Sequence, residues 1–150
     1  MRVILQRVLN GNCEVEGSTT GSIRSGLVAL VGFTHKDTDK DLQWMTDKII
    51  NLRIFEDKTG KMNHSLLDIE GEILSISQFT LYGECRKGRR PNFMNAAPPE
   101  TAEPLYHAFN KKLSENGVNV KTGEFGKMMN ISLTNNGPVT LVLDSPYSAE

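Results

Sequence analysis

The sequence predicts an α+β fold in which antiparallel or mixed β-sheets form a barrel-like core and two main helices pack outside. Many short segments are rich in β-branched and aliphatic residues, whereas only two long segments show helical periodicity. The unbroken apolar run of residues 26–33 also needs cover on both faces of a sheet. With 150 residues, of which 38% are hydrophobic, the chain suits a single domain over residues 1–150.

The N-terminal part of the chain predicts strands separated by turns. Residues 2–9, RVILQRVL, favour a strand and run into Asn10 and Gly11, a pair typical of turns. Short strands joined by Gly17 and Gly21 are expected next. The apolar run that follows predicts a fully buried strand.

Two later segments predict amphipathic helices. The first opens at Thr38, and Asp41 three positions on resembles the partner residue of an N-terminal cap. Its apolar face is marked by Leu42, Met45, Ile49 and Leu52. The second, residues 97–117, has prolines near its start and Gly117 as the expected stop. Its apolar face carries Leu105, Phe109 and Leu113.

The remaining segments predict further strands. Residues 53–63 are expected to turn at Thr59 and Gly60, and residues 73–82 form the next strand. Three closing strands are expected at residues 118–123, 128–135 and 138–144.

Composition excludes several classes of function. The net charge of −1 gives no overall attraction to nucleic acid, so an anionic partner needs a local basic patch. Two cysteines and three widely spaced histidines form neither a disulfide framework nor a metal-ligand pattern, so we expect reduced thiols and no metal. The apolar run at the N-terminus is too short for a signal sequence or a membrane span.

Polar residues gather at the end of the segment 73–82. On a straight strand, Gln78 and Thr80 share one face and Ser77 lies on the other. A single serine or threonine is commonly tolerated in a strand, but this cluster includes an amide that is costly to bury without partners. The cluster therefore indicates a candidate reaction site.

A basic loop follows this polar strand end directly. It carries Arg86, Lys87, Arg89 and Arg90 around Gly88. The loop is either a solvated surface loop or a grip for phosphate groups, and the second interpretation would place a nucleic-acid docking site next to the candidate reaction site.

Two other segments stand out. Residues 122–129 place glycines on both sides of Phe125 and continue to Met129, which suits either a turn with core side chains or a wall around a ligand. Gly137 and Pro138 interrupt a strand-like C-terminus, where proline removes a ladder donor. No catalytic triad or carboxylate pair is indicated, so the residues alone indicate a polar site beside a basic loop that could act on nucleic acid.

Five segments together resemble the D-aminoacyl-tRNA deacylase family. They are MRVILQRV at the start, SQFTLYG at 77–83, KGRRPNF at 87–93, TGEFG at 122–126 and NNGPVT at 135–140. The resemblance implies hydrolysis of the ester between a D-amino acid and the terminal adenosine of tRNA, and removal of glycine mischarged onto alanine tRNA. It also implies a cytoplasmic homodimer with active sites at the interface, and no cofactor or metal.

The resemblance assigns roles to individual residues. The expected catalytic residues are Ser77, Gln78 and Thr80. Substrate-binding roles fall to Phe79, Phe125, Met129, Gly137, Pro138 and Arg7. In the family's Gly-cisPro motif, matched here by Gly137 and Pro138, the turn enters the partner's pocket and is braced by an arginine matching Arg7 and framed by residues matching Asn135 and Thr140. Expected tRNA contacts are Arg86, Lys87, Arg89 and Arg90.

Two departures from the family pattern concern the surroundings of the site. Asn92 stands where relatives often have serine, and Lys127 stands where many have alanine. Lys127 leaves open the tuning of the pocket wall and the tolerance for glycine.

Two mechanisms remain open for the ester hydrolysis. Either Thr80 is a nucleophile, or the protein positions the substrate and the ribose 2′-hydroxyl helps activate water. The second is favoured because no base is recognisable beside Thr80. The alternative functions are a tRNA-binding module without catalysis and an esterase for small aminoacyl esters.

Overall fold

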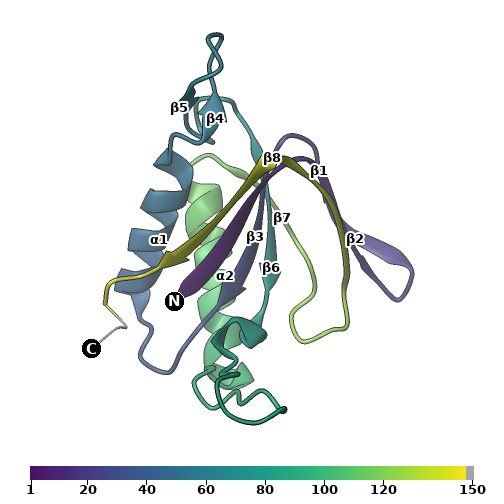
Figure 1. Cartoon of the computed structure of the whole chain (residues 1–150), viewed down its shortest axis with the longest axis vertical. Helices are drawn as coiled ribbons and strands as arrows, with labels where there is room; N and C mark the ends of the chain where they lie inside the picture. The colour runs from purple at the N-terminus through teal and green to yellow at the C-terminus, as the bar shows by residue number, and fades with distance from the viewer. Residues whose placement is uncertain (148–150) are drawn as a thin grey trace.

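A computed structural model describes residues 1–147 as one curved six-stranded sheet with two helices against it, and a separate two-stranded sheet of β4 and β5 (Figure 1). In chain order the elements are β1 (Arg2–Val15), β2 (Ser18–Ile23), β3 (Gly26–Gly32), α1 (Asp39–Asn51), β4 (Phe55–Glu56), β5 (Met62–His64), β6 (Glu72–Ser77), the 3-10 helix η1 (Phe79–Tyr82), α2 (Pro99–Glu115), β7 (Asn119–Thr122) and β8 (Asn130–Asp144). The expected α+β class is confirmed.

The main sheet has mixed pairing and almost closes into a barrel. Its strand order is β2-β1-β3-β6-β7, and β8 pairs with β1. β1 is antiparallel to β2, β3 and β8, whereas β3–β6 and β6–β7 are parallel. The edge strands β2 and β7 approach at Gly21, where a Cβ atom would lie 2.6 Å from the Thr122 carbonyl oxygen. A side chain at this position would therefore force the edges apart.

Hydrophobic side chains fill both faces of the sheet. One cluster joins β1, β3 and β6 to the helices and includes Leu27, Met45 and Phe109. The second contains residues from the strands alone, among them Val28 and Leu74. This two-sided burial explains why β3 reads as an unbroken apolar run.

The helices begin and end where local signals place them. At the start of α1 the backbone N–H of Thr38 donates to the Asp41 carboxylate over 2.8 Å. α2 ends before Gly117, which has a φ of 89° that suits glycine. The predictions of both helices are confirmed. Neither is long and apolar enough to cross a membrane, and no other helix among residues 1–147 is either.

The expected turn at Asn10 and Gly11 is wrong, because β1 runs through both residues. Gly11 pairs with Leu133 of β8, and these cross-strand bonds outweigh the local turn preference. The chain turns instead after Val15, where Gly17 has a φ of 78°.

Two strand boundaries at glycines are also wrong. Gly21 lies within β2 rather than between strands. The two expected C-terminal strands are one element, β8, because both halves pair with the single long strand β1. The register shifts near the Gly137–Pro138 peptide bond, which is cis.

The expected strand over residues 73–82 is too long. β6 stops at Ser77 because its neighbour β3 ends at Gly32, and the last pair is Val31 with Ser77. The N–H of Gln78 donates to the Val31 carbonyl over 2.7 Å, and the chain then coils into η1. The expected straight strand, on which Gln78 and Thr80 share one face, is therefore wrong beyond Ser77.

Candidate functional site

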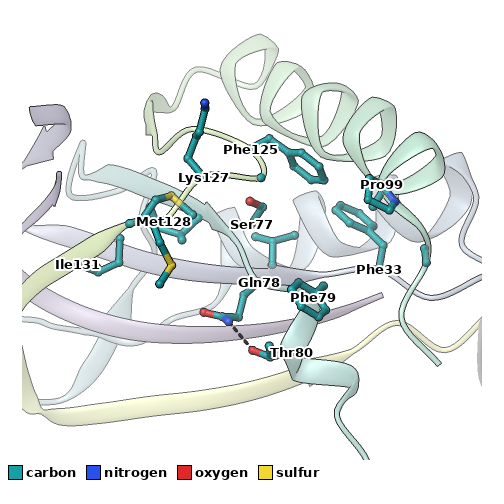
Figure 2. A pocket seen from close by; sticks show the side chains of 16 residues that line it. Phe33, Ser77, Gln78, Phe79, Thr80, Pro99, Phe125, Lys127, Met128 and Ile131 are labelled. Carbon is teal, nitrogen blue, oxygen red and sulfur yellow. Dashed lines mark hydrogen bonds between the residues drawn. The ribbon is translucent and has the colours of Figure 1, made fainter. Parts of the chain in front are cut away.

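A pocket of about 630 Å³ opens at the end of β6 (Figure 2). Its walls come from the end of β3, from residues 76–80, from the start of α2 and from the loop before β8. The pocket volume lies within the range of about 300–1,000 Å³ that is typical of small-molecule sites. Its lining is also typical of such sites, because it is mostly apolar with a few polar groups.

The polar edge of the pocket is built where β6 becomes η1. Ser77 and Gln78 are half-buried, while Thr80 is exposed. The side-chain amide nitrogen of Gln78 donates a hydrogen bond to the Thr80 hydroxyl, as the dashed line in Figure 2 marks. Within residues 1–147 no acceptor is recorded for the backbone N–H groups of Phe79 and Thr80. The edge thus offers donors beside an apolar cavity.

The opposite wall rests on a buried tyrosine. The Phe125 ring packs against the ring of Tyr106 on α2, and the two ring centroids are 5.8 Å apart. The Tyr106 hydroxyl donates to the Ser75 carbonyl oxygen on β6 over 2.6 Å, and burial raises the pKa of this tyrosine. Tyr106 therefore ties the loop carrying Phe125 to both α2 and β6.

Close packing fixes Met129 in the same loop. A Cβ atom on Gly123 would lie 2.5 Å from the Met129 sulfur and 3.2 Å from the sulfur of the buried Cys13. Only glycine leaves this space, so Gly123 allows the thioether to pack against the sheet. Lys127, in contrast, is exposed and extends away from Gln78 and Thr80 in Figure 2.

Arg7 lies apart from the pocket and braces the turn in β8. It is buried, and its guanidinium donates to the Ile54 carbonyl over 2.8 Å and to the Asn136 carbonyl over 3.3 Å. The Asn135 amide also donates to the Val139 carbonyl over 3.1 Å. These bonds hold Gly137 and Pro138 at the surface, away from the pocket lining of their own chain.

The turn is framed by two side chains as well. The Thr140 hydroxyl donates to the Asn135 side-chain oxygen over 3.2 Å. Asn135 also donates to the Arg7 carbonyl oxygen over 3.0 Å, so the frame and the brace form one network.

The basic loop projects beyond η1 and is closed by two backbone hydrogen bonds between Glu84 and Asn92. Arg86 is paired with Glu84: its Nε lies 2.8 Å from the carboxylate, and this hydrogen bonding lowers the Glu84 pKa to about 2. For Lys87, Arg89 and Arg90 no side-chain partner is recorded in the part of the chain that the structure describes. The loop therefore has one compensated and three uncompensated cations.

The structure brings together six of the expected site residues around one pocket: Ser77, Gln78, Phe79, Thr80, Phe125 and Met129. It leaves outside the lining the turn and its brace, Gly137, Pro138 and Arg7, and the four cations of the basic loop. The pocket of a single chain therefore contains only part of the expected site residues.

The family described as D-Tyr-tRNA(Tyr) deacylase matches residues 4–144 of this sequence. The chain belongs to this D-Tyr-tRNA(Tyr) deacylase family. The match covers every residue of the pocket and all of the main sheet except the first two residues of β1.

Relatives of this deacylase-family chain match over nearly its whole length. The protein named D-aminoacyl-tRNA deacylase of Bacillus thuringiensis (strain Al Hakam) is 60% identical over 97% of this chain and 99% of its own length. A solved structure titled c-Myc DNA Unwinding Element Binding Protein is 41% identical, with a TM-score of 0.92 over 97% of this chain and 99% of its own. A probable eukaryotic D-amino acid tRNA deacylase, at 21% identity, shares the fold with a TM-score of 0.81, covering 95% of this chain and 97% of its own.

Several pocket residues of this family member were missed from the sequence. Phe33, Pro99, Ala102 and Met128 all line the cavity. The pairing of the two methionines was visible, but nothing local shows that α2 begins beside the end of β6. Ala102 is one small residue on a helical face, and only the packing of α2 makes it part of a wall.

Proposed function

We propose that this protein hydrolyses the ester bond between a D-amino acid and the terminal adenosine of tRNA, releasing free D-amino acid and tRNA. The observation that carries this proposal is the pocket at the end of β6, which combines donors at Phe79 and Thr80 with an apolar wall. The family match and the name of the 60% identical relative support the same substrate.

The chemistry proceeds by positioning rather than by a nucleophile of the protein. A developing oxyanion would accept hydrogen bonds from the backbone N–H groups of Phe79 and Thr80. Within residues 1–147 these two groups have no recorded acceptor. The Thr80 hydroxyl meets the Gln78 amide, which has no basic site to remove its proton. The ribose 2′-hydroxyl of the substrate then helps to activate the attacking water.

Selection against L-amino acids is assigned to the turn at Gly137 and Pro138 of a second copy of the chain. Both residues are exposed and lie outside their own pocket, and Arg7 holds the carbonyl before Gly137 in place. In a cytoplasmic homodimer with two-fold symmetry, each turn enters the partner's pocket, so the active sites lie at the interface. The turn's backbone would clash with an L side chain and leave room for a D side chain.

Glycine passes the same steric barrier because it has no side chain. The enzyme therefore also removes glycine mischarged onto alanine tRNA. Lys127 is among the lining residues, but its side chain extends away from Gln78 and Thr80, so a lysine in place of alanine leaves room for this small substrate.

The deciding experiment incubates the purified protein with D-tyrosyl-tRNA, with L-tyrosyl-tRNA and with small D-tyrosyl esters. Rapid release of D-tyrosine from tRNA, with L-tyrosyl-tRNA intact, is the expected result. Binding of charged and uncharged tRNA without any release would instead identify a binding module. Equal cleavage of small esters, without salt dependence, would identify a general esterase.

A further inference from the structure

An exposed ledge at the mouth of the pocket is made of two aromatic rings and the methionine that follows the second of them in the chain. The ledge consists of Phe79, Phe93 and Met94, whose exposed fractions are 58%, 38% and 79%. The Phe79 and Phe93 rings meet edge to face, with centroids 5.3 Å apart and planes at 71°. Phe79 also lines the pocket, so the ledge continues the pocket wall outward. Large apolar groups gathered outside a cavity commonly mark a contact surface.

Hydrogen bonds between side chains and the backbone hold Met94 and its neighbours in this exposed position. The N–H of Met94 donates to the Asn92 side-chain oxygen over 2.8 Å, and the His35 ring donates to the Met94 carbonyl over 2.7 Å. The Thr34 hydroxyl donates to the Asn95 carbonyl over 2.6 Å. Both backbone polar groups of Met94 are therefore satisfied while its side chain remains in solvent. The exposure belongs to the folded arrangement, not to a fraying loop.

Phe93 is held by packing as well as by the backbone. Its carbonyl accepts the N–H of Ala96 over 3.1 Å. A Cβ atom on Gly83 would lie 3.0 Å from the Phe93 ring, so glycine leaves the space in which this ring lies. The ring therefore packs over backbone and beside Phe79, with its remaining surface turned outward.

Three uncompensated cations lie between Phe79 and Phe93 along the chain. Lys87, Arg89 and Arg90 are exposed, and the bridge between Glu84 and Asn92 closes their loop immediately before Phe93. Stacking surfaces beside backbone-neutralising cations are how proteins bind single-stranded nucleic acid without reading its sequence. The repeated phosphates of a nucleic acid strand match these cations, whereas a second copy has a nearly balanced net charge of −1, so charge complementarity favours a nucleic acid strand.

We propose that the ledge stacks the nucleotide preceding the terminal adenosine of tRNA, while Lys87, Arg89 and Arg90 receive the adjoining phosphates. This inference rests on the proposed function, because an ester that reacts beside Phe79 and Thr80 brings the terminal adenosine to the pocket. Phe79 belongs to both pocket and ledge, so a strand leaving the pocket meets Phe93 and Met94 next. The contact is by stacking and apolar cover, so it holds any base.

The test uses D-tyrosyl esters of adenosine, of the trinucleotide CCA and of tRNA with two ledge variants. Phe93→Leu keeps apolar bulk but removes the aromatic face, and Met94→Gln removes apolar cover from an exposed position. Met62→Gln is the matched control, because Met62 on the β5 hairpin is also exposed, at 48%. Urea unfolding shows that each variant is folded.

Both ledge variants should lower kcat/KM for the CCA and tRNA esters, by about five- to a hundredfold for Phe93→Leu. The kcat/KM for the adenosine ester should change by less than about twofold, because this ester lacks the second nucleotide, whose contact the variants remove. The Met62 control should match the wild type on all three esters.

Equal losses on all three esters would overturn the proposal, since the ledge would then only support the pocket. Unchanged kinetics on all three would overturn it as well. Loss of dimers in light scattering would show that the ledge covers a second copy instead. If the wild type cleaves no D-tyrosyl ester, the proposed function fails, and fluorescence anisotropy with uncharged CCA still tests the ledge: equal affinity of wild type and variants rejects it.

Discussion

The side-chain amide of Gln78 donates a hydrogen bond to the hydroxyl of Thr80 at the edge of the pocket. This contact orients the hydroxyl but cannot remove its proton, because a neutral amide is not a base at ordinary pH. Thr80→Ala should therefore retain substantial deacylation, with a loss of less than about a hundredfold, whereas loss of a true nucleophile costs several orders of magnitude. Single-turnover kinetics on D-tyrosyl-tRNA measure the loss, and an aminoacyl-Thr80 species in mass spectra would contradict this expectation.

A composite site at a two-fold interface predicts a dimer at micromolar concentration. It also predicts that mixing a pocket variant with a turn variant restores selectivity. One variant carries Gln78→Ala in the pocket and lowers deacylation, and the other carries Pro138→Ala in the exposed turn and loses discrimination against L-tyrosyl-tRNA. Random mixing should lower L-tyrosyl-tRNA cleavage by about half, because half of the dimers are mixed and in each of them the intact pocket receives an intact turn.

Light scattering measures the assembly, and the mixing is done by denaturing and refolding the two chains together. The variants refolded separately are the control. A fully active monomer, or unchanged L-tyrosyl-tRNA cleavage in mixtures that contain mixed dimers, would show that each chain has a complete site.

The pairing of Arg86 with Glu84 predicts unequal contributions within the basic loop. Replacing both Arg89 and Arg90 by glutamine should weaken tRNA binding and reduce the log-log salt slope by about two units, one per lost phosphate contact. Arg86→Gln should change the slope by less, because Glu84 already compensates this charge. Equal slopes for the wild type and the double variant would identify a merely solvated loop.

Steric exclusion at the turn predicts little dependence on the identity of the D side chain. Several D-aminoacyl-tRNAs should be cleaved, whereas rejecting an L-aminoacyl-tRNA ten-thousandfold needs about 5.5 kcal/mol. Added attractive contacts seldom supply so much, so a clash is the more effective device. Rates on D-tyrosyl-, L-tyrosyl- and glycyl-tRNA measure this, and comparable D and L rates would refute it.

The buried hydroxyl of Tyr106 predicts a structural rather than a catalytic role. Tyr106→Phe removes its hydrogen bond to the Ser75 carbonyl and should lower the free energy of unfolding by about 1–3 kcal/mol. The ring contact with Phe125 remains, so kcat should be nearly unchanged. Urea denaturation compares this variant with Tyr147→Phe, a control at a tyrosine that is 54% exposed. A large loss of kcat without loss of stability would contradict the assignment.

Local signals predicted the helices but not all of the strands. Thr38 and Asp41 form the expected cap because both partners lie within one turn of chain. In contrast, the turn expected at Asn10 and Gly11 is overruled by pairing with β8, whose partner Leu133 is distant in sequence. The end of β6 at Ser77 likewise depends on where β3 ends. Such boundaries are set by neighbours that no local pattern contains.

The candidate site divides in the same way. Motif resemblance predicted Gln78, Thr80 and Phe125, and the fold brings their segments to one pocket. The walls formed by Phe33 and Ala102 arise only from the packing of α2 near the end of β3. Neither residue type carries a chemical signal, so sequence reasoning had no means to select them.

The pairing of β1 with β8 also has a consequence for folding kinetics. Arg2 pairs with Asp144 and Glu14 with Asn130, so this long ladder joins the two ends of the described chain. The chain must lose much conformational entropy to bring such distant residues together before their hydrogen bonds and packing can stabilise it. This order of events slows folding. Ile131 of β8 lines the pocket, so a nascent chain acquires its complete cavity only when the two ends have met.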